Sequence, residues 1–142
     1  MGIIAGMTDS FKEQLLKKEH DLEDDTLKIA LYTKDASIGP NTTIYTTSGE
    51  VSGTNYTAGG NVLSGKTITV SGGTVYVDFN DSTWSSATVS DVSGALIYNS
   101  TAGLKSIAVL DFGVSGGISV NASDFKVKFP SATADDAIIR IS

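Results

Sequence analysis

The chain has 142 residues, a formal net charge of −6 and no cysteine. Its length is that of one domain, and the missing thiols exclude structural disulfides, thiolate metal sites and cysteine nucleophiles. Only one of the ten basic residues is an arginine, and the lysines near the N-terminus are followed at once by acidic residues, so a nucleic-acid surface is not expected.

The first seven residues are apolar but resemble no targeting signal. They lack the basic leader and the long hydrophobic core of a signal peptide, and nowhere does the chain approach the roughly 20 apolar residues of a membrane helix. The sequence therefore predicts a soluble, unprocessed protein that does not bind membranes.

Ile3, Ile4 and Met7 are apolar residues that need to be buried somewhere. We interpret residues 1–7 as an N-terminal arm and these three residues as its interface. Docking of the arm on a neighbouring subunit is favoured, because the first turn of a helix can protect only one or two residues before it. The alternative is that they pack under the chain's own helix.

One helix is predicted, over residues 8–19. Ser10 and Glu13 have the spacing of a capping box, and Phe11 and Leu15 can share one face. His20, the sole histidine, follows at a charged helix end. We expect it to be an exposed residue that interacts with the helix dipole, not a general base.

The pattern then changes from helical to alternating. Residues 27–33 are predicted to form a strand, 34–50 a long surface loop, and 62–70 and 74–80 a hairpin around two glycines. In the second hairpin strand the residues predicted to point inward are Val75, Val77 and Phe79, and those predicted to point outward are Tyr76 and Asp78.

Further short runs complete the predicted strands: 87–89, 95–99, 106–112, 118–120, 124–129 and 137–141. Eight or nine strands at hairpin spacing, preceded by one helix, predict a mainly β fold. We expect an antiparallel β-sandwich or flattened barrel with one N-terminal α-helix, forming a single domain of residues 8–142.

No catalytic pattern stands out. With one histidine and no Gly-x-Ser-x-Gly sequence, a serine triad is not expected. The acidic run from Asp21 to Asp25 lacks the frame of an EF-hand loop and is interpreted as a solvated turn. The sequence predicts no enzyme, no cofactor and no metal site.

Two weaker arrangements depend on the tertiary structure. A glycosidase pair would require convergence of scattered carboxylates, namely Glu50, Asp78, Asp111 and Asp124. Tyr56 and Trp84 would form a sugar-stacking platform if both were exposed, although a lone Trp in a small β domain is more often partly buried.

Five segments together resemble a family of small virion proteins of tailed bacteriophages: DTLKIALY (25–32), EVSGTNYTAGG (50–60), WSSAT (84–88), GALIYN (94–99) and AVLDFG (108–113). Within 50–60, Gly53, Gly59 and Gly60 would provide turns around a tyrosine that anchors the loop. The resemblance implies membership of a virus particle and transfers no residue role.

What the resemblance implies agrees with an acidic, cysteine-free, Ser- and Thr-rich chain. We expect a capsid decoration or cement protein that binds the major capsid protein as a homo-oligomer, located in the virion and assembled in the bacterial host cytoplasm. The alternatives are a neck, tail or fibre component, and a glycan-binding module.

Overall fold

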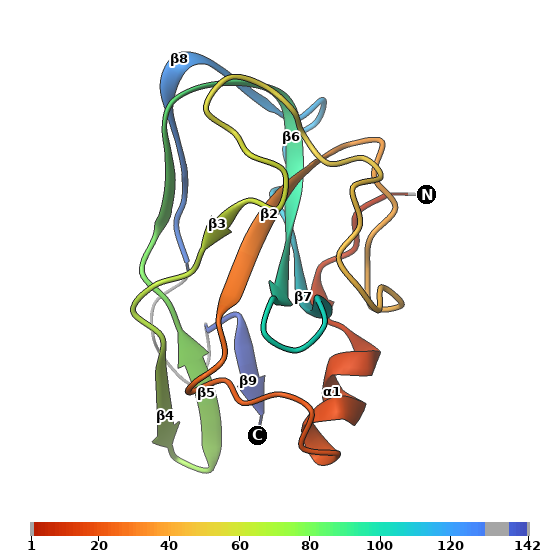
Figure 1. Ribbon diagram of the computed structural model, residues 1–142, viewed down its shortest axis with the longest axis vertical. Coiled ribbons are helices and arrows are strands. Elements are labelled where there is room, and N and C mark those ends of the chain that lie inside the picture. The colour runs from red at the N-terminus through yellow and green to blue at the C-terminus, as the bar shows by residue number, and fades with distance from the viewer. Residues whose placement is uncertain (1, 130–136, 142) are drawn as a thin grey trace.

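The computed structural model describes residues 2–129 and 137–141, which form two antiparallel sheets and one helix (Figure 1). Neither sheet closes on itself. The predicted mainly β, sandwich-like fold with a single N-terminal helix is thus confirmed, and the flattened barrel is not formed. The predicted domain also includes residues 130–136 and 142, which lie outside the described residues.

The larger sheet has the strand order β1–β7–β6–β2–β3, with β8 also paired to β6. Its strands are β1 (Gly6–Met7), β2 (Leu27–Thr33), β3 (Asn61–Val62), β6 (Ser82–Asn99), β7 (Lys105–Asp111) and β8 (Ile118–Val127).

Strand β2 has the predicted bounds, but it is buried on both faces. Leu27, Ile29 and Leu31 face the main core between the sheets, whereas Ala30 and Tyr32 belong to a second apolar cluster on the opposite face. The N-terminal segment and the loop after β2 cover this second face. For that reason Ala30 and Tyr32 are buried as well, on the side opposite the main core.

Strand β6 joins two runs that were predicted as separate strands. It pairs with β8 along its first part and with β2 and β7 along its second part, and its pairing register with β8 shifts repeatedly. Ser86 and Asp91 have positive φ angles of 49° and 58°, and Ala122 in β8 has φ 49°. The predicted breaks are therefore bulges that bend a continuous ribbon.

The smaller sheet consists of β4 (Thr67–Ser71), β5 (Thr74–Asp78) and β9 (Ile139–Ile141), in the order β4–β5–β9. The predicted turn is confirmed, because Gly72 and Gly73 supply the positive φ angles that a two-residue turn between twisted strands requires. The predicted first strand, 62–70, is wrong at its start, because Val62 pairs with Lys28 in the larger sheet and the hairpin begins at Thr67.

Within β5, the predicted orientation holds for Val77 and for Phe79 just beyond it, which are buried. The predicted burial is wrong for Val75, which shares the face of Val77 but is 36% exposed, and for Tyr76, which is buried. Tyr76 lies between Thr69 and Arg140, its partners on the neighbouring strands. Val75 adjoins the hairpin turn, where its apolar face is only partly covered.

The helix α1 (Asp9–Leu16) is shorter than predicted. Its N-cap is Thr8, whose Oγ1 accepts a hydrogen bond from Phe11 N. It ends because Lys18 adopts a left-handed conformation, φ 64°, while Glu19 N donates to Gln14 O. This is the geometry of a Schellman motif. It is not predictable from the sequence, because a lysine occupies the position that is usually glycine.

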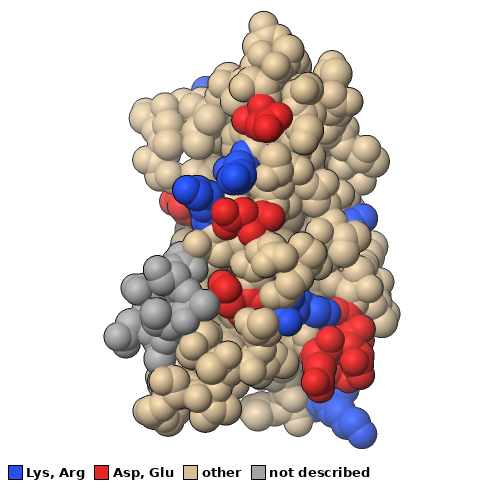
Figure 2. All heavy atoms as spheres, turned by 90° about the vertical axis from the view of Figure 1, so that its left-hand side faces the viewer, with Lys and Arg blue, Asp and Glu red and all other residues tan. Residues whose placement is uncertain are grey.

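On the face seen in Figure 2, acidic and basic side chains lie beside one another on a largely uncharged surface. The cationic patch that binding of a phosphate backbone would require is not seen on this face. In the part of the chain that the structure describes, no helix has the length and apolar character needed to cross a membrane.

Candidate functional site

Segment 50–60 is held together by one carboxylate and is joined to the large sheet through Tyr56 and through backbone hydrogen bonds, among them Val51 N to Leu31 O. Glu50 accepts hydrogen bonds from the Tyr45 hydroxyl (2.5 Å), the Tyr56 hydroxyl (2.5 Å) and Gly59 N (2.8 Å). The Tyr56 oxygen in turn accepts a bond from Leu31 N of β2, at 2.9 Å. The predicted anchoring of this loop by a tyrosine is thus confirmed.

Two further tyrosines extend this cluster. The Tyr32 hydroxyl donates to Thr46 O and the Tyr98 hydroxyl to Gly59 O, each at 2.6 Å. Burial, and after it the charge of Glu50, raises the pKa of Tyr98 to about 12 and that of Tyr32 still further. These hydroxyls are therefore neutral donors at physiological pH, and they serve to hold the loop in place.

His20 is buried, which contradicts the prediction that it is exposed at a helix end. Its ring packs edge-on against Phe11 with ring centroids 5.1 Å apart, and its Nε2 lies 2.9 Å from Gln14 Oε1. Its Nδ1 lies 3.0 Å from Nδ2 of the fully buried Asn99. The left-handed residue at position 18 turns the chain back and brings His20 under the helix.

The hydrogen bonds around Asn99 define the protonation of His20. Asn99 Oδ1 accepts bonds from Thr101 N and Ala102 N, so its amide nitrogen must face His20 and Asp25. An amide nitrogen only donates, which means that His20 Nδ1 accepts and carries no proton. The ring is then neutral, with its proton on Nε2 directed at Gln14.

We expect a loss of stability on mild acidification that depends on His20. Burial and the nearby Lys105 lower the pKa of His20 below 6.5, against the opposing effects of Asp25 and Glu19. Well above pH 6.5 the ring is neutral in both the folded and the unfolded state. Below it the unfolded state takes up the proton first, so the free energy of unfolding falls.

Urea unfolding between about pH 5 and 7, where histidine is the side chain that ordinarily titrates, measures this loss. The variant His20→Gln should be less stable than the wild type at neutral pH but nearly independent of pH in that range. An equal acid loss in the variant would show that another group is responsible.

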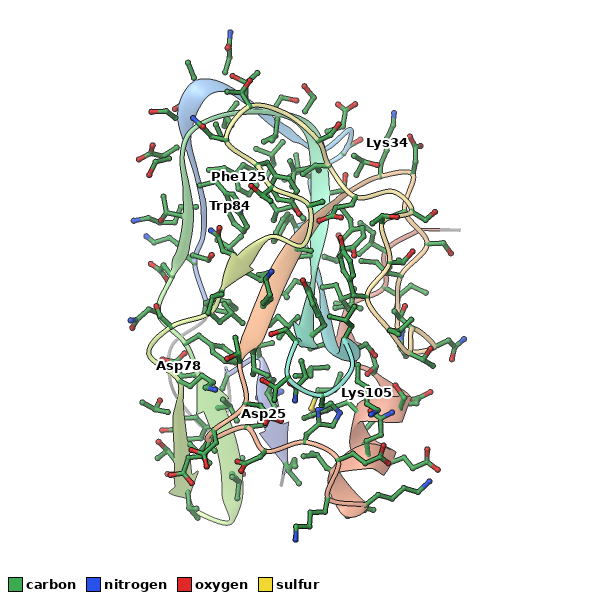
Figure 3. All side chains as sticks on the ribbon, in the orientation of Figure 1. Asp25, Lys34, Asp78, Trp84, Lys105 and Phe125 are labelled. Carbon is green, nitrogen blue, oxygen red and sulfur yellow. The ribbon has the colours of Figure 1, made fainter. Side chains whose placement is uncertain are left out.

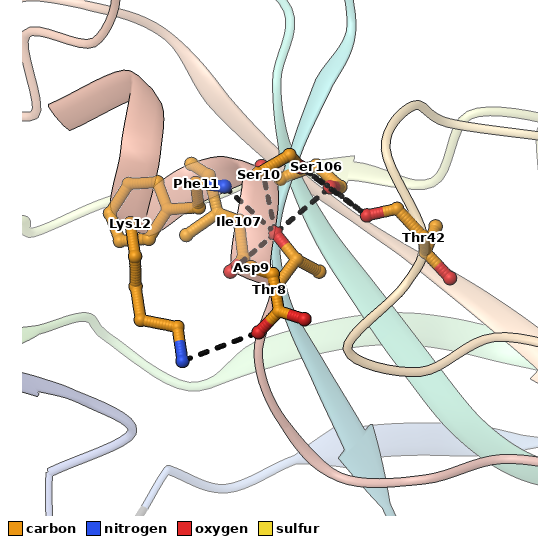
Figure 4. Close-up of polar contacts among 8 residues, drawn as sticks. All are labelled: Thr8, Asp9, Ser10, Phe11, Lys12, Thr42, Ser106 and Ile107. Atoms are coloured by element: carbon orange, nitrogen blue, oxygen red, sulfur yellow. Dashed lines mark hydrogen bonds and ion pairs between the residues drawn. The ribbon is translucent and has the colours of Figure 1, made fainter. Parts of the chain in front are cut away.

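Buried hydroxyl groups connect the start of α1 to β7 and to the loop near residue 42 (Figure 4). The Ser106 hydroxyl lies 3.0 Å from Thr8 Oγ1 and 2.6 Å from Thr42 O. Ser10 also points toward Thr42 O, at 3.5 Å, instead of capping the helix. The chain's only histidine is engaged with Gln14 and Asn99, so these hydroxyls have no imidazole base and serve as structural links.

The four scattered carboxylates lie in different local environments. Asp111 accepts a bond from Gly113 N and Asp124 one from Ser86 N, whereas Glu50 belongs to the tyrosine cluster. Asp78 lies in the smaller sheet, in the lower part of Figure 3. Among the described residues, none of these hydrogen bonds joins two of the four carboxylates.

The acidic run forms the predicted turn. Asp21 Oδ1 accepts bonds from Glu23 N and Asp24 N, and Asp25 Oδ2 accepts one from Asp21 N. Across residues 2–129 and 137–141, no three His, Asp or Glu side chains lie close enough to hold a metal ion.

Trp84 and Tyr56 are both buried, with ring centroids 5.9 Å apart, and Trp84 also contacts Phe125 edge-on (Figure 3). They therefore form part of the core and offer no open platform for a sugar ring. Trp84 Nε1 is the one buried side-chain nitrogen or oxygen without a hydrogen-bond partner among the described residues.

The N-terminal segment is joined to the sheets of its own chain. Residues Gly6 and Met7 pair with β7, and Ile4 N donates to Ile38 O. Ile3 packs on the second apolar cluster and Met7 on the main core, while Ile4 is 62% exposed. Of the three predicted interface residues, Ile4 is thus the one most open to a partner, and its role there stays a prediction.

The clearest candidate interaction surface is the apolar face of the smaller sheet. Cross-strand neighbours place six β-branched residues on this face: Ile68, Val70, Val75, Val77, Ile139 and Ile141. Val77 and Ile139 are buried, but Ile68, Val70 and Ile141 are 47%, 72% and 52% exposed. A groove of about 450 Å³ separates this face from the turn after α1.

This surface was not predicted from the sequence, because the alternation over residues 74–80 placed Val75 in the interior. An alternating strand shows which residues share a face, but it does not show whether another element covers that face.

Comparison with known proteins gives no match to this chain, whether among family models, curated proteins or solved structures.

Proposed function

We propose that the protein is a structural component of a tailed-bacteriophage virion, a decoration or cement protein that binds the major capsid protein as a homo-oligomer. The resemblance of five segments supports this proposal. Three of them include β2, the end of β6 and most of β7, which are adjacent in the large sheet, and a fourth is the loop whose Tyr56 bonds to β2. The resemblance therefore concerns the scaffold of the fold.

The observation that carries the protein-binding role is the exposed apolar face of the smaller sheet. Contiguous exposed apolar surface, distinct from scattered single residues, is typical of protein–protein contact sites. Here the exposed Ile68 and Val70 of β4 and the exposed Ile141 of β9 lie on the same face, with Val75 and Val77 of β5 between them. Ile68 and Ile141 also line the groove beside α1.

A neck, tail or fibre component is the alternative within the same class, because an exposed apolar face would serve an interface in any part of a particle. Quantitative gel analysis of purified particles separates the two locations. Decoration requires a copy number comparable to that of the major capsid protein, and a few copies per particle would exclude it. Electron microscopy of intact particles then locates the protein directly.

Replacement of Ile4 tests the predicted N-terminal contact. We expect Ile4→Asp to lower occupancy on particles, because a charge would be buried against the partner. Folding stability should change by no more than about 0.5 kcal/mol, since Ile4 is 62% exposed in the monomer.

Leu16→Asp is the matched control, because Leu16 is an exposed apolar residue on α1. The two measurements are thermal unfolding of the isolated protein and occupancy on particles. Unchanged occupancy in Ile4→Asp would remove Ile4 from the interface.

A further inference from the structure

Strand β4 lies at the edge of the smaller sheet. Within the part of the chain that the structure describes, it pairs with β5 on one side only, and all five of its residues are exposed. Its sequence, Thr-Ile-Thr-Val-Ser, contains no charged residue and no proline, and its pairing with β5 has no register shift. Monomeric proteins usually protect an edge strand with a charged residue, a proline or a bulge, because the free backbone N–H and C=O groups of the edge can pair with another strand.

The register of the hairpin identifies the backbone groups that are available. Ser71 and Thr74 flank the two-residue turn, so they form a hydrogen-bonded pair, as do Thr69 and Tyr76 two residues further on. Ile68 and Val70 lie at the alternate positions. Their N–H and C=O groups therefore point away from β5, toward the open edge.

We propose that a second copy of this chain occupies this edge, with the two β4 strands antiparallel about a two-fold axis at Thr69. Ile68 then lies opposite Val70 of the second copy, and the outward N–H and C=O groups of both residues are paired. Thr69 lies opposite Thr69 of the second copy as a non-hydrogen-bonded pair, in which the side chains approach closely.

The side chains agree with this register. Ile68 and Val70 lie on the apolar face of the sheet, and they are 47% and 72% exposed in the monomer. Pairing of the edges joins the apolar faces of both copies into one surface and brings no charge to the seam. Because the contact uses the same strand in both copies, it closes at a dimer and does not propagate.

This inference rests on the proposed function, because it specifies how the proposed homo-oligomer forms. It is tested on the isolated protein. A particle can still bind a monomer, so a failure here would be distinguishable from a failure of the virion role. Pairing of five residues buries less than the roughly 1,600 Å² of a standard interface, and the dimer should therefore be weak in dilute solution. Copies held close together on a particle would pair more completely.

Charge substitution at the two-fold axis provides the test. Thr69 is exposed on the polar face, so Thr69→Lys and Thr69→Glu should each fold normally. In either variant two like charges would meet at the axis, and we expect dimerisation to be lost. An equimolar mixture of the two variants brings opposite charges together and should restore a heterodimer. Sedimentation analysis up to about 1 mM, where even weak pairing is detectable, measures each state.

Two further variants complete the design. Thr74→Lys adds the same charge to the same face of β5, away from the edge, and should leave the dimer intact. Val70→Pro removes an outward N–H without removing a bond to β5, and should abolish the dimer. The proposal is overturned if the wild type stays monomeric at about 1 mM, if it forms open-ended fibres, or if mixing restores no dimer.

Discussion

Gly60→Ala is expected to prevent folding of the domain. A Cβ atom at position 60 would lie 1.8 Å from Ile29 O and 2.6 Å from Ile29 C. Both atoms belong to the backbone of β2, which is paired on both sides and cannot move away. Gly60 also has φ +78°, a conformation that L side chains rarely adopt.

We expect the variant to be insoluble, or to lose more than about 4 kcal/mol of stability in urea unfolding followed by circular dichroism. Gly73→Ala is the matched control, since Gly73 also has a positive φ but no atom lies within 4 Å of its added Cβ. That variant should lose only the backbone cost of about 1–2 kcal/mol. Equal losses in both would mean that the loop does not pack against β2.

Glu50→Leu is expected to destabilise the protein by about 3–5 kcal/mol, because it leaves several partly buried donors without an acceptor. These donors are the hydroxyls of Tyr45 and Tyr56 and the N–H of Gly59. Urea unfolding measures the loss. Trp84 fluorescence reports on the loop separately, since the Tyr56 ring stacks on Trp84.

Two further substitutions make the result specific. Glu50→Gln retains an acceptor oxygen and should cost less than Glu50→Leu. Glu13→Leu removes an exposed carboxylate that pairs with Lys17 on the helix surface, and should change stability by about 0.5 kcal/mol or less. A small loss in Glu50→Leu, with unchanged Trp84 fluorescence, would contradict the anchoring role.

Both substitutions fall within residues 50–60, and the structure supplies a physical reason for the composition of this loop. The Glu50 carboxylate accepts the hydrogen bonds within the loop, and Tyr56 connects this carboxylate to β2. Gly60 allows the loop to approach that strand closely. Gly53 has a similar role, because a Cβ there would lie 2.0 Å from Thr88 O. These contacts hold the loop against the sheet, and they explain its Glu, Tyr and Gly residues without a ligand.

The features that were predictable from the sequence are those with local physical causes. Period-two alternation over residues 27–33 defined β2, and a Gly-Gly pair between β-branched runs defined the β4–β5 hairpin. The prediction of separate strands over 87–89 and 95–99 was wrong, since both runs belong to β6, with positive φ angles at Ser86 and Asp91. The turn residues could not show that the ladder continues through these bulges, because strand pairing depends on residues far apart in the chain.

Tertiary structure alone decided which of these surfaces are covered. His20 is buried because a left-handed lysine turns the chain under α1 and because Asn99, distant in sequence, supplies its hydrogen bond. Val75 is exposed because the smaller sheet extends beyond what packs against it, although its alternation resembles that of a core strand. Periodicity reports which side chains share a face, whereas burial depends on the element that packs there, and no local pattern contains that information.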